Sequence, residues 1–166
     1  MENMTINEPS IVDGTAFTVR RTIRIAAPVD KVWAAVTEPE LISRWFGRAE
    51  FSGAGVGALG TLTWDDHGSI PVRIEAVDEP RSITYRWSND DALGDIPDEL
   101  DVEHSTLFTF TLEPVEGGTQ LTVVESGFEN TSDAVANLEY HRQGWDSELD
   151  ELVALVESAA LPGGDS

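Results

Sequence analysis

The sequence predicts a single α+β domain in which a curved antiparallel sheet of six to seven strands is covered by one long C-terminal helix. Three observations predict this class. Short segments in which apolar and polar residues alternate fill the middle of the chain, as in half-buried strands. Turns rich in glycine and aspartate separate these segments closely enough to make neighbouring strands antiparallel. The apolar period changes to three or four residues after residue 131, which is typical of an amphipathic helix.

The first third of the chain predicts a tail, a strand and two short helices. Residues 1–14 are polar and mixed, and we expect a flexible tail ahead of a domain that spans residues 15–160. Residues 16–25 alternate as the first strand. Pro28 suits the first turn of a short helix, and the Glu-Pro-Glu sequence at residues 38–40 ends this helix and starts a second one.

Five further strands are expected in the middle of the chain. An acidic loop at residues 88–101 interrupts them, and we expect its six carboxylates to form a solvated flap beside the mouth of a pocket. The five strands are expected at residues 59–65, 70–77, 82–87, 102–112 and 119–126.

A helix of about 25 residues is expected to end the domain. It is followed by a C-terminal tail at residues 161–166, which begins with Leu-Pro-Gly-Gly. The apolar stripe of this helix contains Leu138, His141, Trp145, Leu149, Leu152 and Val156.

Composition narrows the possible partners. The chain carries 31 acidic residues against 10 basic ones, a net charge of −21, and such a surface repels phosphate backbones and anionic lipid headgroups. We therefore expect no nucleic-acid partner and no membrane partner. There is no cysteine, which excludes disulfides, thiolate nucleophiles and zinc–sulfur sites. No basic leader and no apolar run of about 20 residues is found, so a cytoplasmic location is expected.

A metal or cofactor is not expected. The three histidines lack the spacing of a zinc site. Residues 55–60 match the dinucleotide pattern G-x-G-x-x-G, but a strand follows them where that motif requires a helix.

The order of elements predicts a pocket. A sheet with one apolar face must bury that face, and only the last helix is long enough to cover it. A strongly bent sheet and a single helix rarely fill the space between them, and the remaining volume is typically a ligand cavity lined by aromatic and aliphatic residues.

Several motifs carry a family resemblance. They are Ala-Pro-Val-Asp-Lys-Val-Trp at 27–33, Thr-Glu-Pro-Glu at 37–40, Trp-Phe at 45–46, residues 121–128, and Gly-Trp at 144–145. With these motifs the chain resembles the START-like (SRPBCC, Bet v 1-like) superfamily and, more narrowly, is similar to the homologues of the activator of heat shock protein 90 ATPase. The resemblance implies a helix-grip fold with a hydrophobic cavity, and its relatives include lipid carriers, plant hormone binders, polyketide cyclases and co-chaperones.

Alternate side chains of a strand point to the same face of the sheet. This alternation places four polar residues on the otherwise apolar inner face of the predicted sheet: Arg21, His104, Thr106 and Glu125. If Arg21 and Glu125 lie on adjacent strands, they would neutralise each other; orienting a ligand and catalysis are the alternatives. His104 would either hydrogen-bond a core neighbour or exchange a proton with a ligand, because histidine titrates near neutrality.

The sequence predicts that the domain binds a small hydrophobic or aromatic molecule. Two alternatives stay open: an enzyme of the polyketide cyclase or dehydratase type in which His104 or Glu125 moves protons, and a co-chaperone whose partner is a chaperone. Neither the catalytic residues nor the choice between monomer and homodimer is settled by the sequence. The candidate ligand-binding residues are Arg21, Trp33, Trp64, Tyr85, Trp87, His104, Phe108, Phe110, Glu125, His141 and Trp145.

Overall fold

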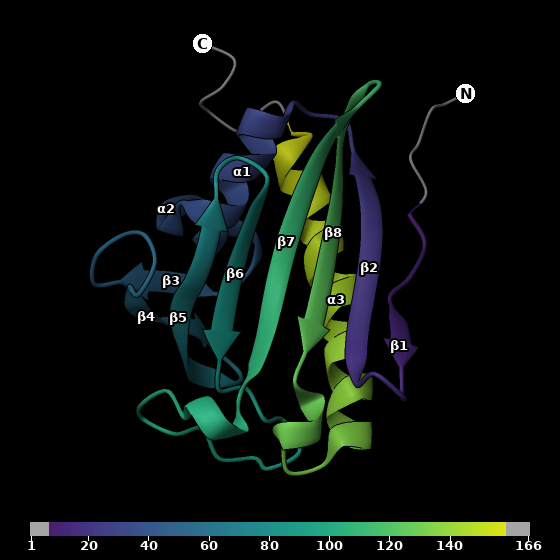
Figure 1. Ribbon diagram of the computed structural model, residues 1–166. Helices are drawn as coiled ribbons and strands as arrows, with labels where there is room; N and C mark the ends of the chain where they lie inside the picture. The colour runs from purple at the N-terminus through teal and green to yellow at the C-terminus, as the bar shows by residue number, and fades with distance from the viewer. Residues whose placement is uncertain (1–6, 159–166) are drawn as a thin grey trace.

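An antiparallel sheet of eight strands forms the body of the computed structural model, which describes residues 7–158 (Figure 1). Its strand order is β1-β2-β8-β7-β6-β5-β4-β3, so the first and last long strands are neighbours. The strands are β1 (Ile11–Asp13), β2 (Thr18–Ile25), β3 (Arg48–Phe51), β4 (Leu59–Trp64), β5 (Gly68–Asp78), β6 (Ser82–Trp87), β7 (Thr106–Val115) and β8 (Gly118–Ser126).

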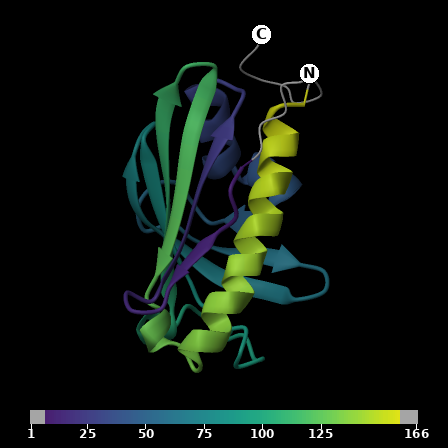
Figure 2. The same cartoon turned by 90° about the vertical axis from the view of Figure 1, so that its right-hand side faces the viewer.

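Within the described residues, three α-helices accompany the sheet. The two short helices α1 (Val29–Thr37) and α2 (Pro39–Trp45) follow β2, and the long helix α3 (Ala134–Val156) ends the described chain. Figure 2 shows α3 running along one face of the sheet. The arrangement confirms the predicted α+β helix-grip fold. Within residues 7–158, none of these helices has both the length and the apolar character that crossing a bilayer requires.

Two strands were not predicted, and both are short. β1 lies inside the predicted tail and pairs with β2, with Val12 opposite Val19. The preceding Ser10 donates two hydrogen bonds to Asp146 of α3, from its backbone N at 2.7 Å and from Oγ at 2.6 Å. The prediction of a flexible tail over residues 1–14 is therefore wrong for this stretch. The predicted tail at 161–166, like residues 1–6, lies outside the described residues.

β3 pairs with β4, with Ala49 opposite Leu62. Its four residues are too few to show the alternation that identifies a strand in a sequence. With these two additions the sheet has eight strands where six to seven were predicted.

The helix α3 packs as its sequence pattern predicts. Asp133 caps its first turn, because the carboxylate accepts a hydrogen bond from the backbone N of Ala136 at 3.1 Å. The buried side chains of α3 include the whole predicted stripe: Leu138, His141, Trp145, Leu149, Leu152 and Val156. This stripe presses α3 against β2, α1 and α2.

Side chains fill most of the space beneath α3. Trp145 packs on Phe108 and Phe110, with ring centroids 5.2 and 5.8 Å apart. Behind these rings only a void of about 10 Å³ remains, too small for a ligand. The expected enclosed cavity is therefore absent from this described part of the core, and the open space lies beside residues 140–148 of α3.

Candidate functional site

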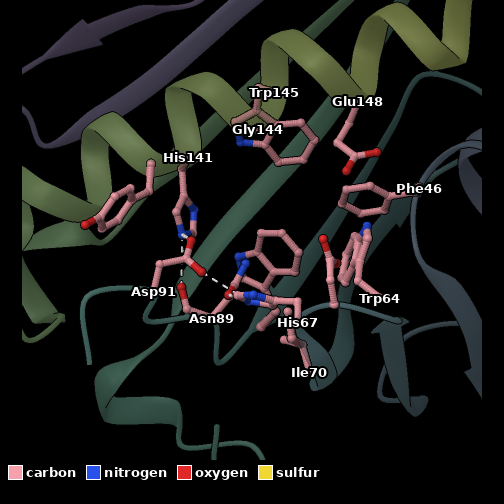
Figure 3. A pocket seen from close by; sticks show the side chains of 13 residues that line it. Phe46, Trp64, His67, Ile70, Asn89, Asp91, His141, Gly144, Trp145 and Glu148 are labelled. Atoms are coloured by element: carbon pink, nitrogen blue, oxygen red, sulfur yellow. Dashed lines mark hydrogen bonds and ion pairs between the residues drawn. The ribbon is translucent and has the colours of Figure 1, made fainter. Parts of the chain in front are cut away.

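A cleft of about 290 Å³, partly open to solvent, lies between α3 and the hairpin of β4 and β5 (Figure 3). Helix α3 forms one wall, the hairpin and the end of α2 form another, and the loop after β6 closes the rim. The cleft is lined by Phe46, Trp64, Asp66, His67, Ile70, Trp87, Asn89, Asp91, Tyr140, His141, Gly144, Trp145 and Glu148.

Four aromatic side chains, which we call the aromatic floor, line the apolar part of the cleft: Phe46, Trp64, Trp87 and Trp145. Phe46 lies at their centre. Its ring centroid is 5.1 Å from that of Trp64, 5.7 Å from Trp87 and 5.6 Å from Trp145, on which it stacks. The floor is therefore one connected cluster supplied by α2, β4, β6 and α3.

A completely buried carboxylate lies behind the floor. Glu125 of β8 accepts hydrogen bonds from Nε1 of Trp87 and Nε1 of Trp145, each at 2.8 Å, and from Oγ1 of Thr106 at 2.5 Å. Nδ1 of His141 lies 2.8 Å from its Oε1. Burial raises the pKa of Glu125, but the charge of His141 and these hydrogen bonds outweigh it, so its pKa lies below the ordinary value. Glu125 is ionised.

His141 of α3 is the cation that balances this carboxylate. Burial lowers the pKa of His141, but attraction to Glu125 and a hydrogen bond to Asp91 raise it to about 10. Its Nε2 donates to the backbone O of Asn89 at 3.0 Å and lies 3.1 Å from Oδ2 of Asp91. Both ring nitrogens are protonated at neutral pH, so His141 has no lone pair with which to act as a base.

Hydrogen-bonded polar side chains continue from the core to the rim of the cleft. Oδ1 of Asp91 lies 3.1 Å from Nε2 of His67, and the same nitrogen lies 3.2 Å from Oδ1 of Asn89 (Figure 3). These contacts join the β4–β5 hairpin, the loop after β6 and α3. They hold the two sides of the cleft together.

Glu148, one turn beyond Gly144 on α3, is a titratable group of the cleft whose pKa lies near neutrality. Burial raises its pKa to about 7, and the charge of Glu151 adds to this, while a hydrogen bond from Trp64 works in the opposite direction. The carboxyl group lies beside Phe46 and Trp64 (Figure 3). It can donate a hydrogen bond when protonated and accept one, or attract a cation, when ionised.

Comparison with known proteins identifies the family. Residues 26–157 match the family model described as Activator of Hsp90 ATPase homolog 1-like protein. The chain belongs to this family. As a member of it, the chain is a START-like domain, as the sequence motifs predicted.

Solved structures place this family member among START-like folds. Protein MLL2253 from Mesorhizobium loti is 26% identical, with a TM-score of 0.72 over 87% of this chain and 99% of that one. DynU16, a protein in the dynemicin biosynthetic locus, is also 26% identical, with a TM-score of 0.67 over 85% of this chain and 47% of that one. CalU16 from Micromonospora echinospora shares the fold at 24% identity, with a TM-score of 0.67 over 99% of this chain and 81% of that one. No curated protein matches the chain.

The structure of this family member brings together part of the predicted site. Four predicted residues line the cleft: Trp64, Trp87, His141 and Trp145. Glu125 lies directly behind them. The predicted residues Trp33, Tyr85, Phe108 and Phe110 are buried in the core outside the cleft lining.

Arg21 is buried as strand parity predicts, but its predicted partner is wrong. Glu125 lies opposite Val19 on the neighbouring strand, and Arg21 lies opposite Val123. The guanidinium reaches α3, where Nη1 donates to the backbone O of Asp146 at 3.1 Å and Nη2 lies 3.0 Å from Oδ1 of Asp150. Alternation along a strand gives the face of the sheet on which a side chain lies but not the direction in which a long arginine extends. Arg21 therefore contacts α3 in place of Glu125, and it links this helix to the sheet away from the cleft.

His104 is not an inward-facing residue. Residues Val102–His104 form one turn of 3-10 helix, and β7 begins only at Thr106. The His104 side chain is 65% exposed, with Nδ1 2.9 Å from Oδ2 of Asp101. The hydrogen bond and the charge of Asp101 raise the pKa of His104. The predicted inward orientation of His104 is therefore wrong, because the turn breaks the alternation on which it depended.

The predicted site omits residues that lie on the cleft side of α3. Residues 141, 144, 145 and 148 recur at three- and four-residue steps, so Gly144 and Glu148 share a face with the two predicted residues. This spacing is a signal that could have found them. The other missed residues come from the end of α2, the β4–β5 turn, β5, the loop after β6 and α3, and only the tertiary structure brings them together: Phe46, Asp66, His67, Ile70, Asn89, Asp91 and Tyr140.

Proposed function

We propose that this protein binds a small apolar or aromatic molecule in the cleft, against the aromatic floor. The observation that carries the proposal is the buried Glu125. Desolvating a carboxylate costs several kcal/mol, and apolar residues of similar volume often give equal or greater stability. What Glu125 provides is orientation, because its hydrogen bonds set the rings of Trp87 and Trp145 beside the cleft.

Gly144 supports the same proposal. It lies near the middle of α3, where glycine costs about 1 kcal/mol relative to alanine. A Cβ atom added to it would meet no atom within 4 Å, so packing does not require glycine here. Because Gly144 lines the cleft, its missing side chain leaves room above the aromatic floor.

The size of the cleft suits a small aromatic ligand. Its volume of about 290 Å³ lies near the lower end of ligand pockets. Burying about 150 Å² of ligand ring surface at roughly 25 cal/mol per Å² supplies about 4 kcal/mol before the cost of association. Such a ligand would therefore be held mainly by apolar contact, with polar groups at the rim setting its orientation.

Blocking the cleft tests the proposal. The probe is 1-naphthalenemethanol, titrated by calorimetry into wild type, Gly144→Phe and Gln143→Phe. Gln143 is exposed on the other side of α3 and donates to Glu139, so its variant adds the same ring outside the cleft. We expect wild type and Gln143→Phe to bind alike and Gly144→Phe to lose at least tenfold in affinity. Equal binding by all three proteins would overturn the proposal, and circular dichroism checks that each is folded.

Native mass spectrometry of freshly purified protein looks for the physiological ligand. The proposal expects a bound mass in wild type that is lost from Gly144→Phe and kept by Gln143→Phe. A mass retained by Gly144→Phe would place that molecule elsewhere on the protein.

A second candidate function is an enzyme of the polyketide cyclase or dehydratase type that uses the same cleft. The observation that favours it is Glu148, because a carboxyl group with a pKa near 7 can both donate and accept protons at neutral pH. Glu125 is unsuited to this role, since its oxygens already accept hydrogen bonds and it has no exposed surface. Conversion of a poly-β-ketone thioester by wild type but not by Glu148→Gln, followed by mass spectrometry, would support the enzyme.

The co-chaperone alternative makes the opposite prediction about the cleft. A protein that acts on a chaperone through its surface should stimulate the ATPase of purified Hsp90 equally well as wild type and as Gly144→Phe. Loss of stimulation in the blocked variant would count against this alternative.

A further inference from the structure

We infer that the ligand of the cleft is a small organic cation, with an aromatic or apolar body that carries a protonated amine. The inference rests on the proposed function, because it assigns the charge of the molecule that the same cleft would bind. It follows from the charges around the cleft and from the chemistry of its floor.

The ionisable groups of the cleft are mainly acidic. Asp66, Asp91 and Glu148 line it, and Glu125 lies just behind. Within the described lining there is no lysine or arginine. The two histidines do not offset this excess for a ligand: His141 is held by Glu125 and Asp91, and His67 lies against Asp91.

Two of these carboxyl groups are available to a ligand. Asp66 lies exposed in the β4–β5 turn and forms no hydrogen bond or ion pair with any residue in the range 7–158. Glu148 lies beside the aromatic floor and is partly buried without a cationic partner there. An ammonium group near them would gain charge-assisted hydrogen bonds, and it would favour the ionised form of Glu148.

The aromatic floor also favours a positively charged ligand. The faces of indole and phenyl rings are electron-rich and attract cations, with tryptophan the strongest, by about 0.5–2 kcal/mol. Three of the four rings of the floor are tryptophans. Trp87 and Trp145 direct the positive N–H edges of their rings to Glu125 and away from a ligand.

An anionic ligand would meet the opposite situation. A carboxylate or phosphate would lie among like charges with no lysine or arginine in the described lining to pair with, and the net charge of −21 would slow its approach. A neutral aromatic molecule could use the floor but would leave Asp66 and Glu148 unused.

Three probes that share a naphthalene ring test the sign of the ligand's charge. These are 1-naphthylmethylamine, 1-naphthalenemethanol and 1-naphthoate, titrated by calorimetry at pH 8 and low salt. We expect the amine to bind at least tenfold more tightly than the alcohol and the naphthoate to bind most weakly. Added salt should reduce the difference between the amine and the alcohol.

Variants of the two carboxyl groups locate the effect. Glu148→Gln and Asp66→Asn should each weaken binding of the amine several-fold more than they weaken binding of the alcohol. Asp65→Asn is the matched control, because Asp65 is the adjacent acid of the same turn and lies outside the cleft lining. It should change amine binding by less than twofold.

The pH dependence gives an independent readout. The affinity for the amine should rise between pH 6 and pH 8 in wild type and stay flat in Glu148→Gln. The other titratable groups around Glu148 are Glu151 and His141 of α3, Asp66 and His67 of the hairpin, and Asp91 of the loop. A His67→Gln variant that keeps the rise assigns it to Glu148.

The outcomes separate this inference from the proposed function. Equal binding of amine and alcohol, or preference for naphthoate, would overturn the inference and leave the cleft as a binding site for another class of molecule. Failure of all three probes to bind would overturn both. Amine binding that survives in Gly144→Phe would place the cation outside the cleft and contradict the inference.

Discussion

The two parts of the space beneath α3 are built differently. Toward the end of the helix, Leu149, Leu152 and Val156 have no exposed surface and fill the gap to the sheet. Around residues 140–148 the helix presents a glycine, a charged histidine and a partly buried glutamate beside the aromatic floor. Aliphatic side chains on closely packed elements leave no room, whereas large rings held in place by a buried carboxylate keep a cleft open.

The two parts of this space also differ in how much they stabilise the protein. The filled part gains free energy from every buried methylene group. The cleft part contains a buried ion pair, a mid-helix glycine and an acid whose charge is disfavoured. Such costs concentrate at functional sites, where stability and activity have different requirements. Five substitutions test this contrast.

The largest effect is expected at the buried ion pair. Glu125→Gln should lower the free energy of unfolding by about 3–5 kcal/mol, because it removes the completely buried counter-charge of the His141 cation and leaves only the partly exposed Asp91. Urea denaturation at pH 7 measures it. The control is Glu139→Gln, which removes a carboxylate on the solvent side of α3, paired with Arg142, and should change stability little. Similar losses in both variants would show that Glu125 has no special role.

The second-largest effect distinguishes side chains that fill the core from side chains that bind the ligand. Leu152→Ala should cost about 2–5 kcal/mol through the cavity that it creates, yet leave the affinity for 1-naphthalenemethanol unchanged. Trp64→Ala, at a half-buried position of the floor, should cost less stability and weaken the probe at least tenfold. Parallel losses of stability and affinity in the two variants would erase the distinction between the two parts.

A smaller effect with a definite pH dependence is expected at Glu148. Its pKa in the folded protein is about 7, above its ordinary value of 4.5, so the folded state binds the proton more tightly than the unfolded state. Its contribution is favourable below pH 4.5 and is lost as the pH rises through 7. Glu148→Gln should therefore match wild type near pH 4. At pH 8 it should be more stable by about 1 kcal/mol, allowing for partial solvent exposure.

Denaturant unfolding across pH 4–8 measures the Glu148 effect. A pH-independent difference between the two proteins would rule out the proposed titration. A variant that gains stability while losing affinity for the amine probe would mark Glu148 as a binding residue.

The smallest effect is expected at Gly144. Gly144→Ala should stabilise the protein by about 0.5–1 kcal/mol, since alanine favours the helix and its Cβ meets no neighbour. Thermal unfolding measures the gain. Destabilisation would mean that the helix needs glycine for packing, and the argument that the glycine keeps the cleft open would fail.

Some of the site could be predicted because it depends on local periodicity. The inward positions of Arg21, Thr106 and Glu125 followed from alternation along single strands, and all three are buried. His141 and Trp145 followed from the helical period and line the cleft. The prediction that His104 faces inward was wrong because a turn of 3-10 helix interrupts the strand alternation just before β7, and no local signal in the sequence marked that turn.

The partners of the buried charged side chains could not be predicted in the same way. Arg21 and Glu125 share the inner face of neighbouring strands, yet one reaches backbone oxygens of α3 and the other holds His141. Which partner a buried charge meets depends on how α3 crosses the sheet. A pattern within one segment carries no information about that crossing.

The order of the longer elements and the face that each one buries could be predicted from the sequence, because both depend on the spacing of apolar residues along a continuous stretch of chain. The tertiary structure alone decided that the enclosed cavity is replaced by an open cleft and that Glu125 is neutralised by His141. It also brought Phe46, Asp66 and Glu148 to one place. The physical reason is that remaining space and charge pairing are properties of segments far apart in the chain, set by how β8, α2, α3 and the β4–β5 hairpin pack together.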